Sequence, residues 1–155
     1  MLDLFARLLR RPARIVTCPE TAQPVAVTST PRFVISSCSR WPERAGCDEA
    51  CAPQIAAEPR GTLVTSIVTR WYRDKPCAYC GRRIGDIEGT VVPGLRGFDG
   101  ELREWREVAP EQLPHMLSES LAVCARCELT ESFRREHPEL VTDRVETPLR
   151  NRAIY

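Results

Sequence analysis

The sequence predicts a small α+β protein in which metal ions stabilise a fold of β-hairpins and short helices. Three observations lead to this prediction. The chain of 155 residues has eight cysteines, which divide into two groups of four, and only 6% of its residues are aromatic. Stretches rich in β-branched residues alternate with turn signals and short amphipathic stretches. A chain of this length with a thin hydrophobic core needs crosslinks, which the cysteines are expected to supply.

The first four-cysteine module is expected over residues 14–60 and begins with strands. RIVTC and PVAVTST flank the turn PETAQP, and RFVISSC is a third stretch rich in β-branched residues. A loop then leads into a short helix after Gly46, where Asp48 and Glu49 favour the first turn.

The second module is expected over residues 61–140 and begins with RGTLVTSIVTRWYRDK. The β-branched residues of this stretch favour a strand, but its apolar positions favour a helix. One helical face collects Leu63, Val64, Ile67, Val68 and Trp71. The periodicity is the stronger signal, so we predict a helix.

A β-hairpin and a final helix complete the second module. RIGDIEGTVVPGL and ELREWREVAP are predicted strands, joined by the Asp-Gly turn of RGFDGE. APEQLPHMLSES is expected to be a loop or a short helical turn, and CARCELTESFRREHPEL a helix that Pro138 ends. Residues 141–155 are interpreted as a tail that is either extended or docked on a partner.

The spacing of the second cysteine group is the strongest functional signal. Cys77 and Cys80 are two residues apart and precede Gly81, and Cys124 and Cys127 repeat this spacing at the start of a predicted helix. A tight turn aims two sulfurs at one ion, and the positive end of a helix favours thiolates. Four thiolates at about 2.3 Å suit a tetrahedral zinc ion. We therefore predict a metal site here.

A turn with two cysteines, a β-hairpin and a helix with two more cysteines together resemble the treble-clef class of zinc fingers. The resemblance covers residues 76–136 and depends on Cys77, Cys80, Gly81, Cys124 and Cys127. It implies an architecture and a structural zinc ion, and it implies no particular activity.

The first cysteine group is less regular and consists of Cys18, Cys38, Cys47 and Cys51. Cys47 and Cys51 are four residues apart, so a helix would place both on one face. Cys18 and Cys38, at predicted strand ends, would complete a second four-cysteine site. The alternatives are buried or free cysteines and a redox pair. In total we expect two zinc ions.

Iron is the alternative metal for Cys77, Cys80, Cys124 and Cys127. Rubredoxin also uses two pairs of cysteines with this spacing, although Glu128 stands where its second loop commonly has glycine. An iron–sulfur cluster can also take four thiolates. Iron would make the protein an electron carrier. A thioredoxin-like dithiol is disfavoured, because a second pair is available to complete a metal site.

Residues 1–13 are expected to form an amphipathic docking helix that ends at Pro12. Its apolar residues are Leu2, Phe5, Leu8 and Leu9. The alternative is a peripheral contact with a membrane surface through residues 2–11. No apolar run reaches the roughly 18 to 20 residues of a membrane span, and no export signal is apparent. We expect a cytoplasmic protein, free or held at a membrane through a partner, in which paired cysteines are metal ligands more often than disulfides.

The remaining composition favours a non-catalytic role. The chain has two histidines, His115 and His137, and no phosphate-binding loop. We therefore predict no enzyme and infer no small-molecule substrate. The net charge of +1 gives no overall attraction to nucleic acid, although Arg82, Arg83, Arg134 and Arg135 leave a nucleic-acid-binding regulator as a further alternative. An interaction or accessory subunit with a protein partner is the main expectation.

Overall fold

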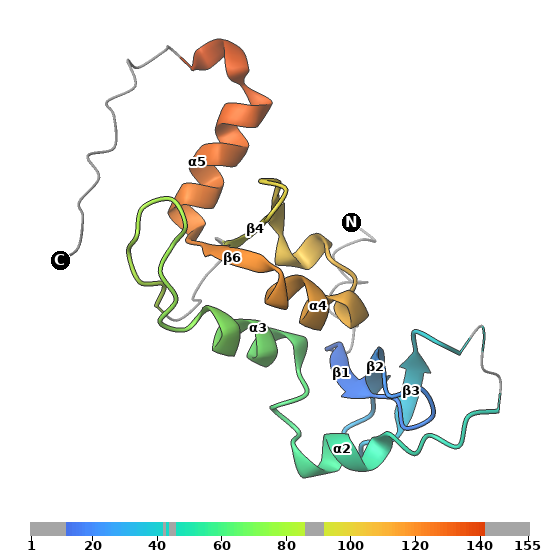
Figure 1. Cartoon of the computed structure of the whole chain (residues 1–155). Helices are drawn as coiled ribbons and strands as arrows, with labels where there is room; N and C mark the ends of the chain where they lie inside the picture. Colours follow the sequence, from blue (N-terminus) through green and yellow to red (C-terminus); the bar gives the residue numbers. More distant parts are fainter. Residues whose placement is uncertain (1–11, 42, 44–45, 86–91, 142–155) are drawn as a thin grey trace, which may run out of the picture.

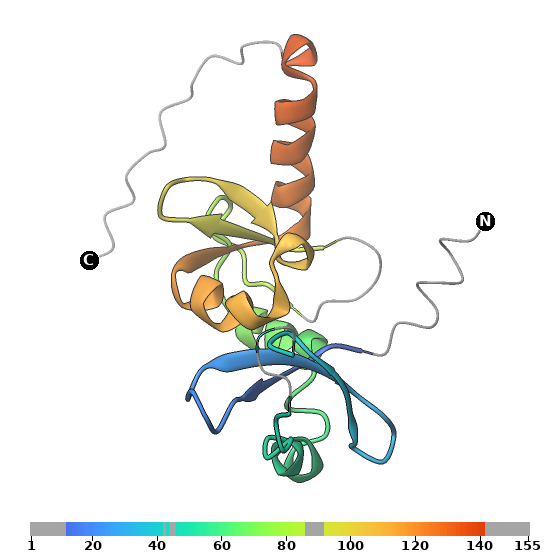
Figure 2. The same ribbon diagram turned by 90° about the vertical axis from the view of Figure 1, so that its right-hand side faces the viewer.

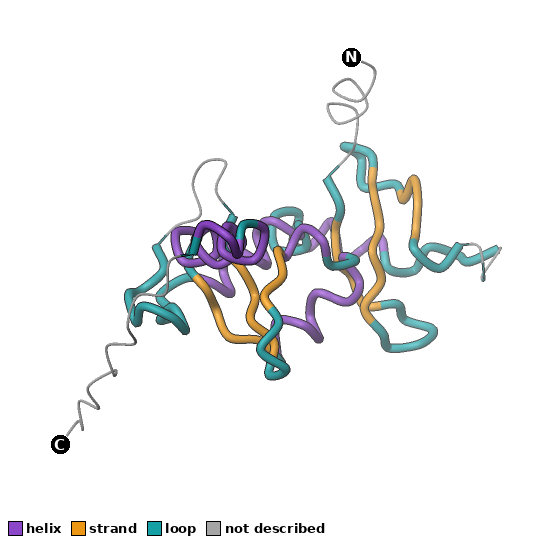
Figure 3. The backbone as a smooth tube through the Cα atoms, turned by 90° about the horizontal axis from the view of Figure 1, so that it is seen from above, coloured by secondary structure: helices purple, strands orange, loops and turns teal. Residues whose placement is uncertain are grey.

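The computed structural model describes residues 12–41, 43, 46–85 and 92–141. Over these residues the chain forms two three-stranded antiparallel sheets and several short helices (Figure 1). Figure 3 shows the two sheets apart from one another, with helices between them. The predicted α+β class is confirmed. Most of the predicted docking helix (1–11) and nearly all of the predicted tail (142–155) lie outside the described residues.

The first sheet has the order β1-β2-β3 and confirms the three predicted strands. They are β1 (Arg14–Thr17), β2 (Pro24–Ser29) and β3 (Ile35–Cys38). Helix α2 (Ala52–Ala57) packs on one face through Ile55, which is fully buried. The sheet contributes Val16, Val25, Val27 and Ile35 to this core.

Helix α2 begins later than the sequence indicated, so the expected shared helical face of Cys47 and Cys51 is wrong. Cys51 is the residue at the N-cap, and Cys47 lies in the preceding loop. Glu49 has a φ of +57°, in the left-handed region, which a right-handed helix cannot include. Pro53 lies in the first turn of α2, where its missing N–H needs no partner.

Helix α3 (Val64–Tyr72) confirms the helical interpretation of its β-branched stretch. Val68 and Tyr72 are fully buried along it. The segment before α3 joins strand β1, since Ile15 N–H donates to Thr62 C=O at 2.8 Å. Successive side chains of a strand face opposite sides, and Ile15 accordingly belongs to the second core while Val16 belongs to the first. Strand β1 is therefore shared by both halves.

The second sheet has the order β5-β4-β6, with β4 (Gly94–Gly97), β5 (Leu102–Glu104) and β6 (Ser120–Val123). The predicted hairpin is confirmed, because β4 and β5 pair in antiparallel register around a turn in which Gly100 has a φ of +83°. Strand β6 was not predicted. It is four residues long and largely buried, so it has no alternating pattern to detect.

The predicted strands of this half were too long. Among the described residues of the stretch 83–95, only Gly94 and Leu95 belong to a strand. The stretch 101–110 leaves β5 after Glu104 and continues as η1 (Trp105–Glu107) and η2 (Pro110–Gln112). Proline lacks the N–H that a ladder requires, which fits the start of η2 at Pro110. Helix α4 (Leu113–Ser118) follows and confirms the predicted short helical segment.

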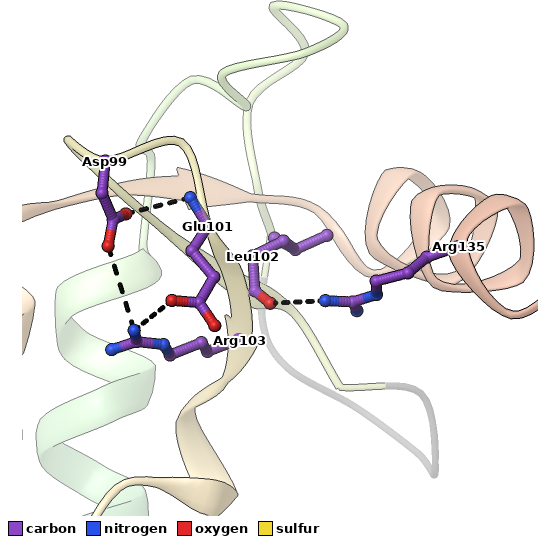
Figure 4. A network of polar contacts seen from close by, with 5 residues as sticks. All are labelled: Asp99, Glu101, Leu102, Arg103 and Arg135. Carbon is purple, nitrogen blue, oxygen red and sulfur yellow. Dashed lines mark hydrogen bonds and ion pairs between the residues drawn. The ribbon is translucent and has the colours of Figure 1, made fainter.

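Helix α5 (Ala125–Glu136) confirms the last predicted helix and extends away from the sheet (Figure 2). Pro138 begins η3 (Pro138–Leu140) just beyond its end. Arg135 attaches α5 to the hairpin by donating to Leu102 C=O at 3.2 Å, and Arg103 pairs with Asp99 and Glu101 in the same hairpin (Figure 4). Among the described residues, no helix is long and apolar enough to cross a membrane.

Candidate metal centre

A tight turn over Cys77–Arg82 carries the first two cysteines of the centre. Cys77 N–H donates to Arg82 C=O at 2.8 Å, and Gly81 N–H donates back to Cys77 C=O at 2.9 Å. Gly81 has a φ of +70°, so its conformational freedom is required to close the turn. The predicted turn between Cys77 and Gly81 is confirmed.

Strand β6 and helix α5 deliver the other two cysteines. Cys124 is the N-cap residue of α5 and Cys127 lies in its first turn. The turn and the strand are attached directly, because Ala78 N–H donates to Ala122 C=O at 2.8 Å. This contact brings cysteines from two distant parts of the chain to the positive end of one helix.

The four sulfurs of Cys77, Cys80, Cys124 and Cys127 all lie within 4.8 Å of one another. The sulfurs of Cys80 and Cys124 are 3.8 Å apart. Four sulfurs at about 2.3 Å from a tetrahedral ion are separated by about 3.8 Å, which matches the distance between Cys80 and Cys124. All four cysteines are free, and 3.8 Å is far longer than a disulfide bond of about 2.05 Å. The group could therefore hold a metal ion.

The environment of Cys77 favours its thiolate. Burial acts to raise the pKa of this sulfur, but N–H donors from Cys124, Cys80 and Tyr79 outweigh burial and lower the pKa to about 6. The Cys124 N–H lies 3.2 Å from the sulfur. Only 3% of Cys77 is exposed, so its thiolate would be a largely buried negative charge at the centre.

The neighbouring thiols respond in the opposite direction. Burial, followed by contacts with the other thiols, raises the pKa of Cys127. Burial also raises the pKa of Cys124. Four adjacent thiolates repel one another, and a divalent cation removes this repulsion. The four cysteines therefore need a bound cation if all of them are to be thiolates.

Two polar residues behind the centre were not predicted from the sequence. The buried Tyr72 hydroxyl donates to Gly94 C=O at 2.8 Å, and burial, with a contribution from the charge of Glu128, raises its pKa. Glu128 is only 6% exposed and accepts a hydrogen bond from Ser132 at 2.6 Å. A Cβ at Gly94 would lie 2.8 Å from Glu128 Cγ, so this glycine permits α5 to approach β4. The burial of Tyr72 could have been predicted, because Tyr72 follows Val68 by four residues and continues the helical periodicity. No pattern in the sequence indicated that Glu128 is buried.

The other four predicted ligands, Cys18, Cys38, Cys47 and Cys51, do not form a compact group of sulfurs in the structure. Cys18, Cys38 and Cys51 belong to the first core or pack against it. Among the described residues, Cys18, Cys38, Cys47 and Cys51 do not form a group with all sulfurs within 4.8 Å. The second predicted site therefore remains a prediction at this point. Cys47 lies instead within 4.8 Å of carboxylate oxygens of Glu20 and Asp48.

Comparison of the chain with protein-family models, curated proteins and solved structures finds no match. The site is therefore assigned from its geometry alone. Cys77, Cys80, Cys124 and Cys127 constitute a candidate four-thiolate metal centre between a tight turn and a helix N-terminus.

Proposed function

We propose that the protein is a non-catalytic zinc-binding protein in which a structural ion at Cys77, Cys80, Cys124 and Cys127 holds the second half together. The observation that carries this proposal is the mutual proximity of the four sulfurs, with 3.8 Å between those of Cys80 and Cys124. The order of turn, hairpin and cysteine-bearing helix supports a treble-clef-like arrangement. All four positions of a tetrahedral ion would be filled by the protein, as in structural sites.

Metal analysis of protein purified under reducing conditions without added metal tests this assignment. We expect bound zinc, no visible colour, and loss of one ion per chain in the Cys80→Ser and Cys124→Ser variants. Bound iron, a coloured protein and reversible reduction would instead support an electron carrier, which the exposure of Cys80 favours. Cysteines recovered as disulfides would contradict both assignments.

We further propose that the protein is an interaction or accessory subunit of a larger assembly. Helix α5 carries exposed apolar side chains at Leu129 (60%) and Phe133 (49%), one turn apart. They line a groove of about 530 Å³ between α5 and β5, and glutamates dominate its charged residues. The glutamates are Glu101, Glu104, Glu107, Glu128 and Glu136. A protein segment that combines apolar and basic side chains would complement this groove.

The accessory role is tested by quantitative co-purification from the native host with a matched pair of variants. Leu129→Ser with Phe133→Ser removes the apolar lining of the groove. Thr130→Ala with Arg134→Ala changes the neighbouring face of α5 and serves as the control. We expect one protein to be enriched with the wild type and the control and lost with the first variant. Equal recovery of all proteins by the three baits would contradict the proposal. We place the protein in the cytoplasm, where thiols stay reduced for metal binding.

One observation favours nucleic-acid binding as a second candidate function. A groove of about 400 Å³ beside the metal centre is lined by Tyr79 and by Arg82, Arg126 and Arg134. Arginines bind phosphates and an exposed aromatic ring can stack on a base. Binding that weakens steeply with salt and is lost in the Arg82→Ala, Arg126→Ala variant would support this function over a protein partner.

A further inference from the structure

The turn over Cys18–Gln23 repeats the backbone of the turn over Cys77–Arg82. Cys18 N–H donates to Gln23 C=O at 2.9 Å, and the equivalent bond from Cys77 to Arg82 measures 2.8 Å. The fifth residue of each turn donates back to the cysteine carbonyl, at 2.8 Å from Ala22 and 2.9 Å from Gly81. These two residues also share a positive φ, +55° at Ala22 and +70° at Gly81. Alanine rarely adopts this conformation, so the turn is imposed by the fold.

The equivalence of the two turns identifies a missing cysteine. Cys80 lies three residues after Cys77, and Thr21 lies three residues after Cys18. The first turn therefore has the backbone of the second turn but provides one sulfur in place of two.

The segment after β3 approaches the turn that follows β1. Strands β1 and β3 both run antiparallel to β2; Cys18 follows Thr17, which pairs with Pro24, and Cys38 pairs with Val27 further along β2. Arg40 connects the two segments by donating to the Thr21 hydroxyl at 2.9 Å. Gln54 places α2 beside them, because its side-chain amide bonds to the Thr17 backbone at 2.9 and 2.6 Å.

The start of helix α2 also carries a cysteine. Cys51 is the N-cap residue of α2 and Cys124 is that of α5, with a helical backbone at Cys51 and an extended backbone at Cys124. Cys51 is buried, and Cys18 and Cys38 pack against the same core. Burial raises the pKa of Cys51, and smaller contributions in the same direction come from Cys38, Cys47 and Cys18.

Cys47 is the remaining member and approaches the turn from the loop. Its sulfur lies within 4.8 Å of a Glu20 carboxylate oxygen, in the turn that follows Cys18. The Glu49 N–H donates to this sulfur at 3.4 Å. Backbone donors of this kind stabilise thiolates that bind metals.

We propose that Cys18, Cys38, Cys47 and Cys51 form a second four-thiolate centre for a divalent ion of the zinc class, built on a turn that repeats the one at Cys77. No three of these sulfurs lie within 4.8 Å of one another in the structure, so the segments that carry them move together when the metal binds. This centre goes beyond the proposed function, which needs only the cluster at Cys77.

Native mass spectrometry of the reduced full chain, loaded with zinc and freed of excess, tests the proposal by stoichiometry. We expect two ions in the wild type and in a Thr21→Ser control, and one ion in Cys18→Ser, in Cys51→Ser and in Cys77→Ser. One ion in the wild type that persists in Cys18→Ser and Cys51→Ser would overturn the second centre and leave the proposed function intact. One ion in the wild type that is lost only in these two variants would overturn the proposed function alone.

Alkylation of the wild type provides a readout that does not depend on the folding of variants. Each cysteine is followed by peptide mass spectrometry with zinc and after chelation. We expect Cys18, Cys38, Cys47 and Cys51 to react at least about tenfold more slowly with zinc, in parallel with one another. Equal rates at these four cysteines with and without zinc, while Cys77 is protected, would overturn the proposal.

The equivalence of Thr21 and Cys80 has its own test. In a Cys47→Ser background, Thr21→Cys restores four sulfurs and provides two of them from one turn. We expect the second ion, lost in Cys47→Ser, to return in the double variant. Continued binding of a single ion would show that the two turns are not equivalent.

Discussion

In the second half of the chain, the sulfurs of Cys77, Cys80, Cys124 and Cys127 lie within 4.8 Å of one another, whereas no three of the first-half cysteines reach that proximity. Both halves use the same turn and a cysteine at a helix N-cap. The difference is the source of the remaining ligands. In the second half they lie within the turn and the helix, and in the first half Cys38 and Cys47 come from a strand end and a loop. The fold positions the second-half cysteines before metal binds, because they lie on a tight turn and at the start of a helix.

The largest expected effect is loss of the second-half centre. Cys77→Ser should reduce metal affinity by more than about 100-fold, because changes at partners of metal ligands alone cost about 10–100-fold. It should also lower the free energy of unfolding, since metal binding contributes to folding. Competition with a metal-binding dye measures the affinity, with Thr130→Ser as the control. Unchanged affinity would exclude Cys77 as a ligand.

A matched pair of core substitutions tests whether the halves fold as one unit. Ile55→Ala in the first core and Leu113→Ala in the second each remove a side chain that is at most 1% exposed. Each should cost about 2–5 kcal/mol. Because β1 belongs to both cores, we expect one unfolding transition by calorimetry that both variants shift. Two separate transitions, each moved by one variant, would mean that the halves unfold independently.

The pH dependence of the metal-free, reduced protein isolates the anionic position at Cys77. Its folded-state pKa of about 6 lies below the ordinary thiol value, so its contribution to stability is fully present above pH of about 8.5 and is lost as the pH falls through about 6. The difference in free energy of unfolding between the wild type and Cys77→Ser should therefore shrink over this range. Denaturant titrations from pH 8.5 to pH 5.5 measure it. A difference that grows on acidification would contradict the prediction.

The Tyr72 hydroxyl supports the centre at Cys77 from inside the core. Tyr72→Phe removes the donor to Gly94 C=O inside the core. It should cost about 1–3 kcal/mol, the usual penalty for a buried polar group left without its partner. Tyr79→Phe, at an exposed ring, is the control and should have almost no effect on chemical denaturation. Equal effects of the two substitutions on the free energy of unfolding would show that the Tyr72 hydroxyl has no structural role.

The smallest expected effects distinguish the two turns. Gly81→Ala places a side chain at a φ of +70° and should cost about 1–2 kcal/mol. Ala22→Gly relieves the same conformation in the first turn and should stabilise the protein by up to about 1 kcal/mol after the entropy of glycine is counted. Thermal unfolding measures both. Substitutions that act in the same direction would contradict the equivalence of the turns.

The elements that were predictable from the sequence are those with a local signal. The periodicity of residues 63–71 predicted α3, the Asp-Gly pair predicted the β4–β5 hairpin, and the cysteine spacing predicted the second-half cluster. Strand β6 was missed because it has only four residues, too few to show an alternating pattern. The shared helical face of Cys47 and Cys51 was wrong because spacing alone does not reveal a positive φ at Glu49.

X-ray absorption at the edge of the bound metal identifies the ion and counts the sulfurs around it. The protein is purified under reducing conditions without added metal, so that the ion is the one acquired in the cell. We expect zinc surrounded by four sulfurs at about 2.3 Å. Fewer than four sulfurs per ion, or nitrogen and oxygen ligands in their place, would contradict a centre built from Cys77, Cys80, Cys124 and Cys127.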